Sequence, residues 1–270
     1  MNASSYPRTT WRLLHSAPAD GPINMAVDEA ILRAVGAELS PPTLRLYAWA
    51  PPCLSLGRAQ QAADVNREEL EAAGFDLVRR PTGGKAILHA DELTYSVVAP
   101  RGEPRVAGDI VESYRILSTG LVRGLERLGI AGIVADRQAV RQGDGPVCFE
   151  VASDYEITVG GRKLVGSAQM RAQGIVLQHG ALPLHGDVAR ICPLLTARPD
   201  PVRVRARTAT VEQALGRSIS WEEAAQALAA GFAEALNLEL AAGHLSDQER
   251  AWAEELRAQK YAAPTWTQRV

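Results

Sequence analysis

A two-glycine turn between two short runs of strand-forming residues restricts the fold of this 270-residue chain more than any other feature. Gly160 and Gly161 separate "DYEITV" from "RKLVGSAQMR". A two-residue loop of this kind joins antiparallel strands, because its backbone twist matches theirs when both residues take positive φ. The sequence therefore predicts an antiparallel hairpin. Counting outward from the turn gives its cross-strand pairs: Val159–Arg162, Thr158–Lys163 and Ile157–Leu164.

The same count decides on which face of the hairpin Lys163 lies. Successive side chains of a strand point to opposite faces. The apolar face then consists of Tyr155, Ile157, Val159 and Leu164. The other face consists of Lys163, Thr158, Val165 and Ser167. If the apolar face meets helices, Lys163 points either to solvent, as hairpin lysines usually do, or into a ligand groove.

Hydrophobic periodicity places the other elements. Apolar residues at helical spacing predict amphipathic helices over residues 23–36, 66–74 and 110–128. Ser220 with Glu223, and Ser246 with Glu249, form capping-box patterns that begin two alanine-rich helices. Apolar runs bounded by turn residues predict strands over these segments: 43–49, 53–57, 75–80, 85–89, 92–100 and 174–184.

Together these elements predict an α+β fold, with a mixed or antiparallel sheet and helices packed on it. We expect one domain over residues 1–270, with a core of about 23–204 and a small helical C-terminal segment of about 205–270. No apolar run approaches the 18 residues that a membrane span needs, and the start lacks the apolar core of a signal peptide. A net charge of −2 indicates no nucleic-acid partner. We therefore expect a cytoplasmic protein.

Residues 79–96, "RRPTGGKAILHADELTYS", combine two arginines, a Pro-Thr-Gly-Gly break and an apolar run that ends in histidine. Gly83 and Gly84 lack a Cβ, so their N–H groups can approach a ligand closely. Arg79 and Arg80 offer positive charge for a carboxylate, a phosphate or an acidic partner. The simpler alternative is a hairpin whose glycines turn the corner and whose arginines are solvated. The spacing of a Walker phosphate loop is absent.

The three cysteines, Cys53, Cys148 and Cys192, are too few and too scattered for a disulfide framework or a zinc site. Cys53 and Cys192 lie in apolar runs, and we expect both to be buried. Cys148 follows a polar loop and is either structural or a nucleophile, which needs exposure and a nearby cation. Cys148 lies ten residues before Thr158, roughly 33 Å along an extended strand, so spacing alone does not bring it to Lys163.

Four motifs in this chain together resemble one group of enzymes. They are "INMAVDEA" (23–30), "RRPTGGKAILHADELTYS" (79–96), "VCFEVASDYEITVGGRKLVGSAQMR" (147–171) and "GIVLQHG" (174–180). With these motifs the chain resembles the superfamily of lipoate–protein ligase A, octanoyltransferases and biotin ligases. It resembles in particular the cysteine-dependent octanoyltransferases that charge the glycine cleavage H protein. The likeness covers most of the chain and implies a class II biotin–lipoate ligase-like catalytic domain.

The resemblance also implies roles for individual residues. Cys148 falls at the position of the acyl-thioester nucleophile, and Lys163 at that of the lysine that contacts the acyl carbonyl and favours the thiolate. The substrate-binding residues are Arg80, Thr82, Gly83, Gly84, Lys85 and His89 on one wall of an acyl pocket, and Ser167, Ala168, Gln169, His179 and Gly180 on the other. Two positions depart from the pattern. Ala90 stands where relatives often have Asp, so it is in doubt whether a carboxylate forms a hydrogen bond with His89. Lys85 stands where Arg is common. No metal or cofactor is implied.

The implied reaction is transfer of octanoyl from acyl carrier protein to a lysine of a lipoyl-accepting protein, such as glycine cleavage H protein or a lipoyl domain. No ATP is needed, because one thioester replaces another before the amide forms. The alternatives are an ATP-dependent lipoate–protein ligase, an octanoyl amidotransferase between lipoyl proteins, and a non-catalytic subunit that binds lipoyl domains. Cys148 and the chain length argue against the ligase, whereas the motifs separate the amidotransferase poorly.

A further hypothesis concerns the donor protein. Arg203, Arg205 and Arg207 alternate in a segment that we interpret as irregular or edge-like. On a strand edge they would form a one-sided basic stripe that fits an acidic carrier protein. The alternative is an ordinary solvated strand edge.

Overall fold

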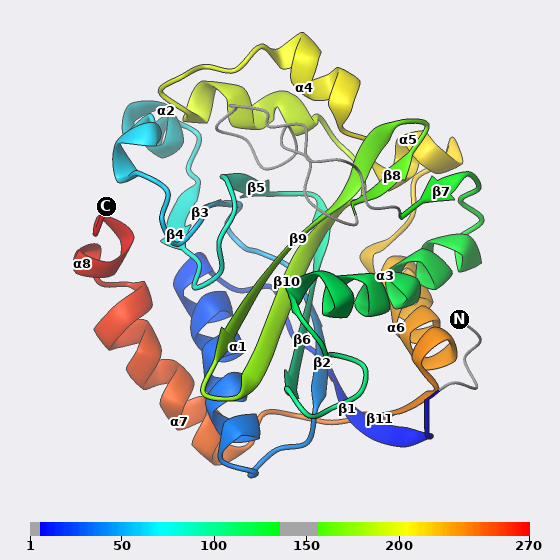
Figure 1. The fold of residues 1–270 in the computed structure, drawn as a ribbon. Helices are drawn as coiled ribbons and strands as arrows, with labels where there is room; N and C mark the ends of the chain where they lie inside the picture. Colours follow the sequence, from blue (N-terminus) through cyan, green and yellow to red (C-terminus); the bar gives the residue numbers. More distant parts are fainter. Residues whose placement is uncertain (1–5, 136–155) are drawn as a thin grey trace.

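An eight-stranded sheet runs through the computed structural model, which describes residues 6–135 and 156–270 (Figure 1). Its strand order is β11-β1-β2-β6-β10-β9-β8-β7. Neighbouring strands are parallel from β11 to β2 and antiparallel elsewhere. The strands are β1 (Thr9–His15), β2 (Thr43–Tyr47), β6 (Glu92–Pro100), β7 (Ile133–Val134), β8 (Ile157–Val159), β9 (Arg162–Ala172), β10 (Ile175–Pro183) and β11 (Leu238–Ala242). The predicted α+β fold with a mixed sheet is confirmed.

Two pairs of helices cover opposite faces of this sheet (Figure 1). On one face α3 (Ile110–Arg127) packs with α6 (Trp221–Leu236), and on the other α1 (Gly21–Gly36) packs with α7 (Asp247–Leu256). All residues of β2 and β10 are buried, because each central strand has a helical layer on both sides. None of the helices in the described part of the chain combines the length and hydropathy that a membrane span requires.

The remaining helical elements are short and lie between or after the main ones. They are α2 (Arg67–Ala72), α4 (Pro201–Arg207), α5 (Val211–Leu215), α8 (Pro264–Thr267), 3-10 turns at Ala62–Asp64 and Val188–Leu194, and a π-helical turn at Arg257–Tyr261.

A second, three-stranded sheet corrects the hairpin interpretation of residues 79–96. Its order is β4 (Asp76–Arg79), β3 (Cys53–Leu56), β5 (Ile87–His89). β3 pairs in parallel with β4 and antiparallel with β5. Gly83 and Gly84 therefore lie in a loop that crosses over β3 to connect β4 with β5, and not in a tight turn between two paired strands. The alternative of solvated arginines is also wrong, because Arg79 and Arg80 are both buried.

The two-glycine hairpin forms as predicted next to its turn and then departs from the prediction. Gly160 and Gly161 have φ of 55° and 73°, and Thr158 pairs with Lys163 as expected. A β-bulge then places Ile157 opposite Val165 instead of Leu164. Lys163 is only 4% exposed, so the interpretation of a solvated hairpin lysine is wrong.

The part of the chain after residue 200 differs most from the prediction. Residues 201–207 form the helix α4, because Asp200 caps its first turn and Pro201 begins it. The alternating arginines therefore do not share one edge, and Arg205 pairs with Asp187 at 2.7 Å. β11 adds a strand beside β1 within the segment expected to be helical, and β1 itself was not predicted.

The C-terminal helix α7 is attached to the sheet through one buried carboxylate, Glu249. Ser246 and Glu249 form the predicted capping box, whereas at α6 only the Ser220 half of the pattern is present. Glu249 also accepts two hydrogen bonds from Arg12 of β1, at 2.8 and 2.5 Å. Burial alone would raise the pKa of Glu249, but the hydrogen bonds from Arg12 and Ser246 outweigh it and hold the pKa below its ordinary value.

We expect Glu249→Gln to lower the free energy of unfolding by about 2–3 kcal/mol at pH 7, because it leaves the Arg12 guanidinium without its carboxylate in a mostly buried site. Glu239→Gln is the matched control, since the Arg8–Glu239 pair is exposed and should contribute less than about 1 kcal/mol. Urea unfolding of the three proteins measures both values.

The same variants give a pH dependence of known sign. A carboxyl with a lowered pKa stabilises the fold fully above the ordinary glutamate pKa of about 4.3, and this contribution is lost as pH falls below it. The stability difference between the wild type and Glu249→Gln should therefore shrink between pH 5 and pH 3. A difference that stays constant over this interval would contradict the assignment.

Candidate active site

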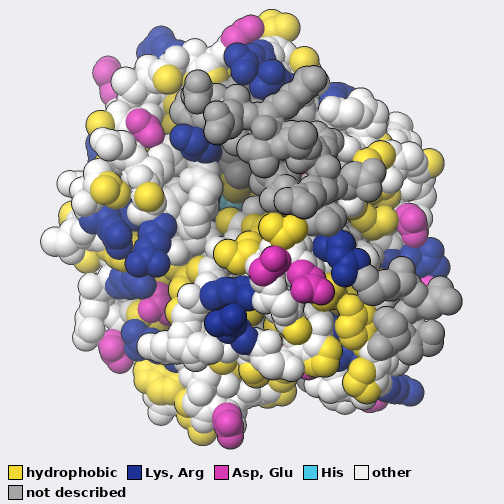
Figure 2. Space-filling model, in the orientation of Figure 1, with side chains coloured by type: hydrophobic (Ala, Val, Ile, Leu, Met, Phe, Trp, Pro, Cys, Tyr) yellow, Lys and Arg dark blue, Asp and Glu magenta, His cyan; other side chains and the backbone are white. Residues whose placement is uncertain are grey.

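A small cavity lies where the two sheets meet. Its walls come from α1, β2, β3, β5, β6, β9 and β10. Figure 2 shows a hollow between the positions of β5 and β9, with hydrophobic side chains and a histidine beside it. The lining residues are Met25, Tyr47, Trp49, Ser55, Arg80, Ile87, His89, Thr94, Ala168, His179, Gly180 and Ala181. Five of these were predicted from the sequence: Arg80, His89, Ala168, His179 and Gly180.

A hydrogen-bonded chain fixes the wall that contains His179. His179 Nε2 lies 2.7 Å from Thr82 Oγ1, and Nδ1 lies 3.2 Å from Asp28 Oδ2. Asp28 is fully buried on α1 and accepts further bonds from Arg45, at 2.8 Å, and from the Tyr47 hydroxyl, at 3.0 Å. Burial alone would raise the pKa of Asp28, but the hydrogen bonds and charges of His179 and Arg45 outweigh it and lower the pKa. Thr82 and His179 are thus connected, through the Asp28 carboxylate, to Arg45 and Tyr47 of the central strand β2.

A second chain fixes His89 on the opposite wall. Its ring stacks on Trp49 with centroids 4.0 Å apart, Nδ1 lies 3.3 Å from Glu92 Oε1, and Nε2 lies 2.8 Å from Ser55 Oγ. Burial lowers the pKa of His89, against the opposing effect of Glu92. The neutral ring donates from Nδ1, because a carboxylate only accepts, and Nε2 is left to accept from Ser55. Glu92 therefore supplies the carboxylate that Ala90 left in doubt.

Arg80 shapes the loop that contains the two glycines. Its guanidinium donates to the carbonyls of Gly83, at 2.8 Å, Lys85, at 2.7 Å, and Ser55, at 3.1 Å. Gly84 has φ of 93°, in the left-handed region that favours glycine. The loop packs so closely on Gly57 that a Cβ there would lie 1.9 Å from the Gly84 carbonyl oxygen. Gly83, Gly84 and Lys85 are exposed at the end of this loop.

The motif "GSAQ" divides its residues between the two faces of the sheet. Ala168 lies opposite His179, on the face of the cavity. Ser167 and Gln169 lie on the other face, where Ser167 Oγ is 2.7 Å from the Tyr95 hydroxyl and Gln169 Nε2 donates to Gln178 and Ser113. The structure therefore does not place the side chains of Ser167 and Gln169 in the cavity with the others.

Lys163 lies further along β9, next to the segment after α4. Its ammonium donates to Glu156 Oε1 at 2.5 Å, and both side chains are at most 7% exposed. Its backbone pairs with Thr208 and accepts from Ala209 N–H at 2.9 Å. Cys148, the predicted nucleophile, lies outside the described residues, as does Tyr155. Cys53 and Cys192 are buried as expected, and burial raises the pKa of the Cys53 thiol.

Sequence reasoning missed the residues that support the two histidines: Asp28, Arg45, Ser55, Trp49 and Glu92. A signal existed for two of them. Asp28 lies among the apolar positions of an amphipathic helix, and Arg45 alternates with leucines in a strand. Charged residues at such positions are buried only when they are paired. The sequence could therefore have suggested that Asp28 and Arg45 form an ion pair.

Comparison with known proteins identifies the family. A model of the lipoyl protein ligase A/B catalytic domain matches residues 20–233. The chain belongs to the lipoyl protein ligase A/B family. The predicted resemblance is thus confirmed.

Two curated relatives of this lipoyl protein ligase A/B family member are named octanoyltransferase LipM. The protein from Kyrpidia tusciae is 46% identical over 272 residues, which cover 96% of this chain and 99% of the relative. The protein from Symbiobacterium thermophilum is 43% identical, with 97% and 99% covered.

Among solved structures, a lipoate-protein ligase A bound with ATP superposes with a TM-score of 0.82 and 27% identity, covering 96% of this chain and 99% of that one. A bipartite lipoate protein ligase from Thermoplasma acidophilum, studied with its E2 lipoyl domain, has a TM-score of 0.78 and 26% identity, with 96% of both chains covered. The predicted class II biotin–lipoate ligase fold is confirmed by these neighbours.

The glycines of the site give a stability test. A Cβ on Gly180 would lie 2.6 Å from both Ser167 Oγ and Tyr95 Cε1 and 2.7 Å from the Gly166 carbonyl oxygen, whereas a Cβ on Gly83 meets nothing within 4 Å. Gly180→Ala should therefore lower the free energy of unfolding by about 1–3 kcal/mol. Gly83→Ala is the control and should stay within about 0.5 kcal/mol of the wild type. Equal losses in urea unfolding would show that the close approach at Gly180 is not what requires glycine.

Proposed function

We propose that this chain transfers octanoyl groups in lipoate biosynthesis by way of a thioester on Cys148. The proposal is supported by full-length relatives named octanoyltransferase LipM and by one observation in the structure. Five residues that the family resemblance assigns to an acyl pocket line one largely apolar cavity.

The cavity suits a saturated acyl chain for a reason that is visible in its walls. The polar groups of His89, His179 and Arg80 are hydrogen-bonded to protein partners, so a hydrocarbon that fills the cavity leaves no protein group without its bond. Seven carbons beyond the carbonyl contribute about 0.8 kcal/mol each, or about 5 kcal/mol together. This favours octanoyl over much shorter chains.

In the proposed reaction the Cys148 thiolate attacks the thioester carbonyl of the donor. A new C–S bond forms on the enzyme, and the donor C–S bond breaks to release the carrier thiolate, which takes a proton from solvent. The ammonium of the acceptor lysine loses a proton to solvent and attacks as a free amine. An amide C–N bond forms as the nitrogen loses a second proton to solvent, and the enzyme C–S bond breaks to return the thiolate. Neither step needs ATP.

Lys163 is proposed to stabilise the negative charge that develops on the acyl oxygen in both steps. Its ammonium is held by Glu156 in a buried site, where a charge acts more strongly than in water. The ion pair also fixes the direction of a long side chain that would otherwise be mobile.

Two protein partners follow from this chemistry, an acyl donor and a lipoyl-accepting protein. We propose octanoyl-acyl carrier protein as the donor. Glycine cleavage H protein or a lipoyl domain is the proposed acceptor.

Incubation with octanoyl-acyl carrier protein, without ATP, should add the mass of one octanoyl group to Cys148. Intact-protein and peptide mass spectrometry measure the adduct, and Cys148→Ser should not retain it as a thioester labile to hydroxylamine. Cys53→Ser and Cys192→Ser are the matched controls and should keep the adduct, because both thiols are buried.

Other outcomes of this experiment identify the alternatives. Modification of an acceptor that requires octanoate and ATP, with no adduct on Cys148, would favour the ligase. An adduct that forms only from an octanoylated lipoyl protein would favour the amidotransferase. No transfer from any donor, with binding of lipoyl domains retained, would favour a non-catalytic subunit.

Lys163→Met should slow adduct formation by about 100-fold or more, because no positive charge then faces the developing oxyanion. It should also destabilise the fold, since the buried Glu156 carboxylate loses the Lys163 ammonium. The double variant Lys163→Met/Glu156→Gln should recover much of the stability without recovering the rate. Urea unfolding and timed mass spectrometry separate the two effects, and a double variant with restored transfer would rule out the proposed role of Lys163.

A further inference from the structure

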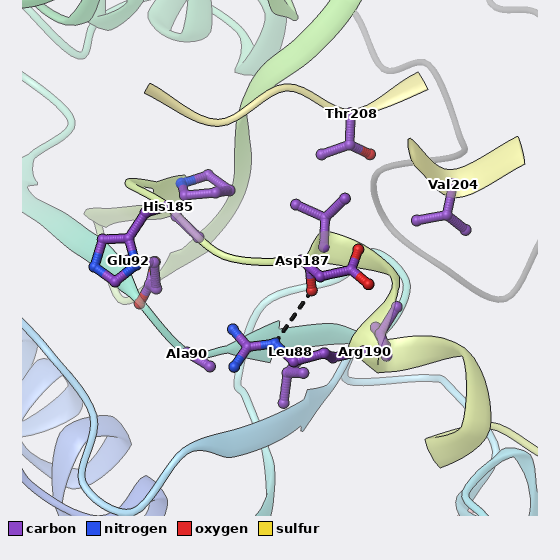
Figure 3. A pocket seen from close by; sticks show the side chains of 12 residues that line it. Leu88, Ala90, Glu92, His185, Asp187, Arg190, Val204 and Thr208 are labelled. Carbon is purple, nitrogen blue, oxygen red and sulfur yellow. Dashed lines mark hydrogen bonds between the residues drawn. The ribbon is translucent and has the colours of Figure 1, made fainter. Parts of the chain in front are cut away.

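A second cavity adjoins the acyl cavity and is called the outer chamber below. Ala181 borders both cavities. Apolar side chains form much of its wall: Leu88, Val188, Ile191 and Val204. Figure 3 labels Leu88 and Val204 among the lining residues. The chamber also reaches Thr208, whose backbone pairs with that of Lys163. It therefore borders both the acyl cavity and the backbone neighbour of Lys163.

Two residues that line the outer chamber each have a buried oxygen atom without a hydrogen-bond partner in the described part of the chain. Glu92 Oε2 and Thr208 Oγ1 have no partner among residues 6–135 and 156–270, although the two residues are only 6% and 1% exposed. Figure 3 shows them on different sides of the chamber. Most buried polar atoms in proteins are hydrogen-bonded, so two such atoms on one cavity indicate groups that a ligand satisfies.

The other oxygen of Glu92 is already used. Oε1 accepts from His89 Nδ1 and from the Thr94 hydroxyl, and Thr94 in turn accepts from Trp49 Nε1 at 2.8 Å. These bonds hold the carboxyl group beside His89 of the acyl cavity, and Glu92 also lines the outer chamber. Glu92 is thus a rigid acceptor site and not a side chain that rotates to find a partner.

We propose that the outer chamber receives the lysine side chain of the acceptor protein, with its ammonium bound by Glu92 Oε2. This inference rests on the proposed function and adds the residue that positions the attacking amine. The apolar walls match the methylene stem of a lysine, and a carboxylate accepts only, so its partner must be a donor. A cation also neutralises the buried charge, which a neutral amide N–H does not.

The charges at the entrance agree with a cationic ligand. Arg190 is paired with Asp91, and Arg205 donates to Asp187 at 3.0 and 2.7 Å. Arg190 also donates to the carbonyl of Asp187, the bond drawn in Figure 3. Each of these two arginines is paired with an aspartate, so neither presents an uncompensated positive charge to an incoming ammonium.

Glu92→Gln tests the proposal by separating the two half-reactions. Gln keeps an oxygen that can accept from His89 and Thr94, but it turns an N–H group toward the chamber. Formation of the octanoyl adduct should stay within about threefold of the wild type, and transfer from the isolated adduct to a lipoyl domain should fall at least tenfold. Glu239→Gln is the control, because this exposed carboxyl pairs with Arg8 and lines neither cavity, and both half-reactions should persist. Equal loss in both half-reactions of Glu92→Gln would overturn the proposal.

Release of the octanoyl group to small amines distinguishes binding of an ammonium by Glu92 from a purely structural role of this residue. Butylamine is an ammonium near pH 8, whereas hydroxylamine is uncharged. Glu92→Gln should slow release of the octanoyl group to butylamine at least tenfold and leave release to hydroxylamine unchanged. A loss that is the same for both amines would contradict binding of an ammonium.

A binding cycle keeps the inference testable if the proposed function fails. A lipoyl domain and its Lys→Met variant are titrated against wild-type protein and Glu92→Gln by calorimetry. Loss of the lysine should weaken binding at least fivefold with wild type and by less than twofold with Glu92→Gln. Independent effects of the two substitutions would refute the lysine site, whatever the adduct experiment shows.

Discussion

The buried carboxylate of Asp28 is the interaction on which the rest of the site depends. It receives hydrogen bonds from Arg45 and Tyr47 of β2 and from His179 of β10, and so joins helix α1 to two central strands. A buried ion is tolerated only when its partners replace the water that it lost. That requirement fixes the orientation of His179, and His179 in turn holds Thr82 at the start of the glycine loop.

Hydrogen-bonded series of side chains like this one leave the cavity apolar, although several of the residues that line it are polar. Both ring nitrogens of His179 and of His89 form hydrogen bonds with protein groups. The guanidinium of Arg80 donates hydrogen bonds to carbonyl groups of the glycine loop and of Ser55. What remains facing the cavity is carbon, from the rings of Trp49 and Tyr47 and from small residues of β9 and β10. Residues with polar side chains thus line a cavity whose exposed surface is mostly apolar.

The sequence predicted features that depend on local geometry. The two-glycine turn determined the first pairs of the hairpin, and capping residues marked α7. It did not predict the bulge after Lys163, because a bulge is settled by packing of Ile157 and Val165 in the core. It misplaced residues 201–207, since alternation of Arg and Val imitates a strand while Asp200 and Pro201 begin a helix. The carboxylate of Glu92 at His89 was missed because the resemblance directed attention to position 90.

The carboxylates of Asp28 and Glu92 differ in how many of their oxygens accept hydrogen bonds from the protein. Each holds a histidine of the acyl cavity, but Asp28 uses both oxygens for protein donors, whereas Glu92 uses one. An oxygen that is desolvated, fixed and without a donor in the described residues costs free energy that the fold does not recover. Such a cost is expected where a ligand repays it, as at sites that are organised in advance for a charged group. Asp28 therefore belongs to the framework of the cavity, whereas Glu92 keeps one oxygen without a donor in the described residues, as the proposed lysine site requires.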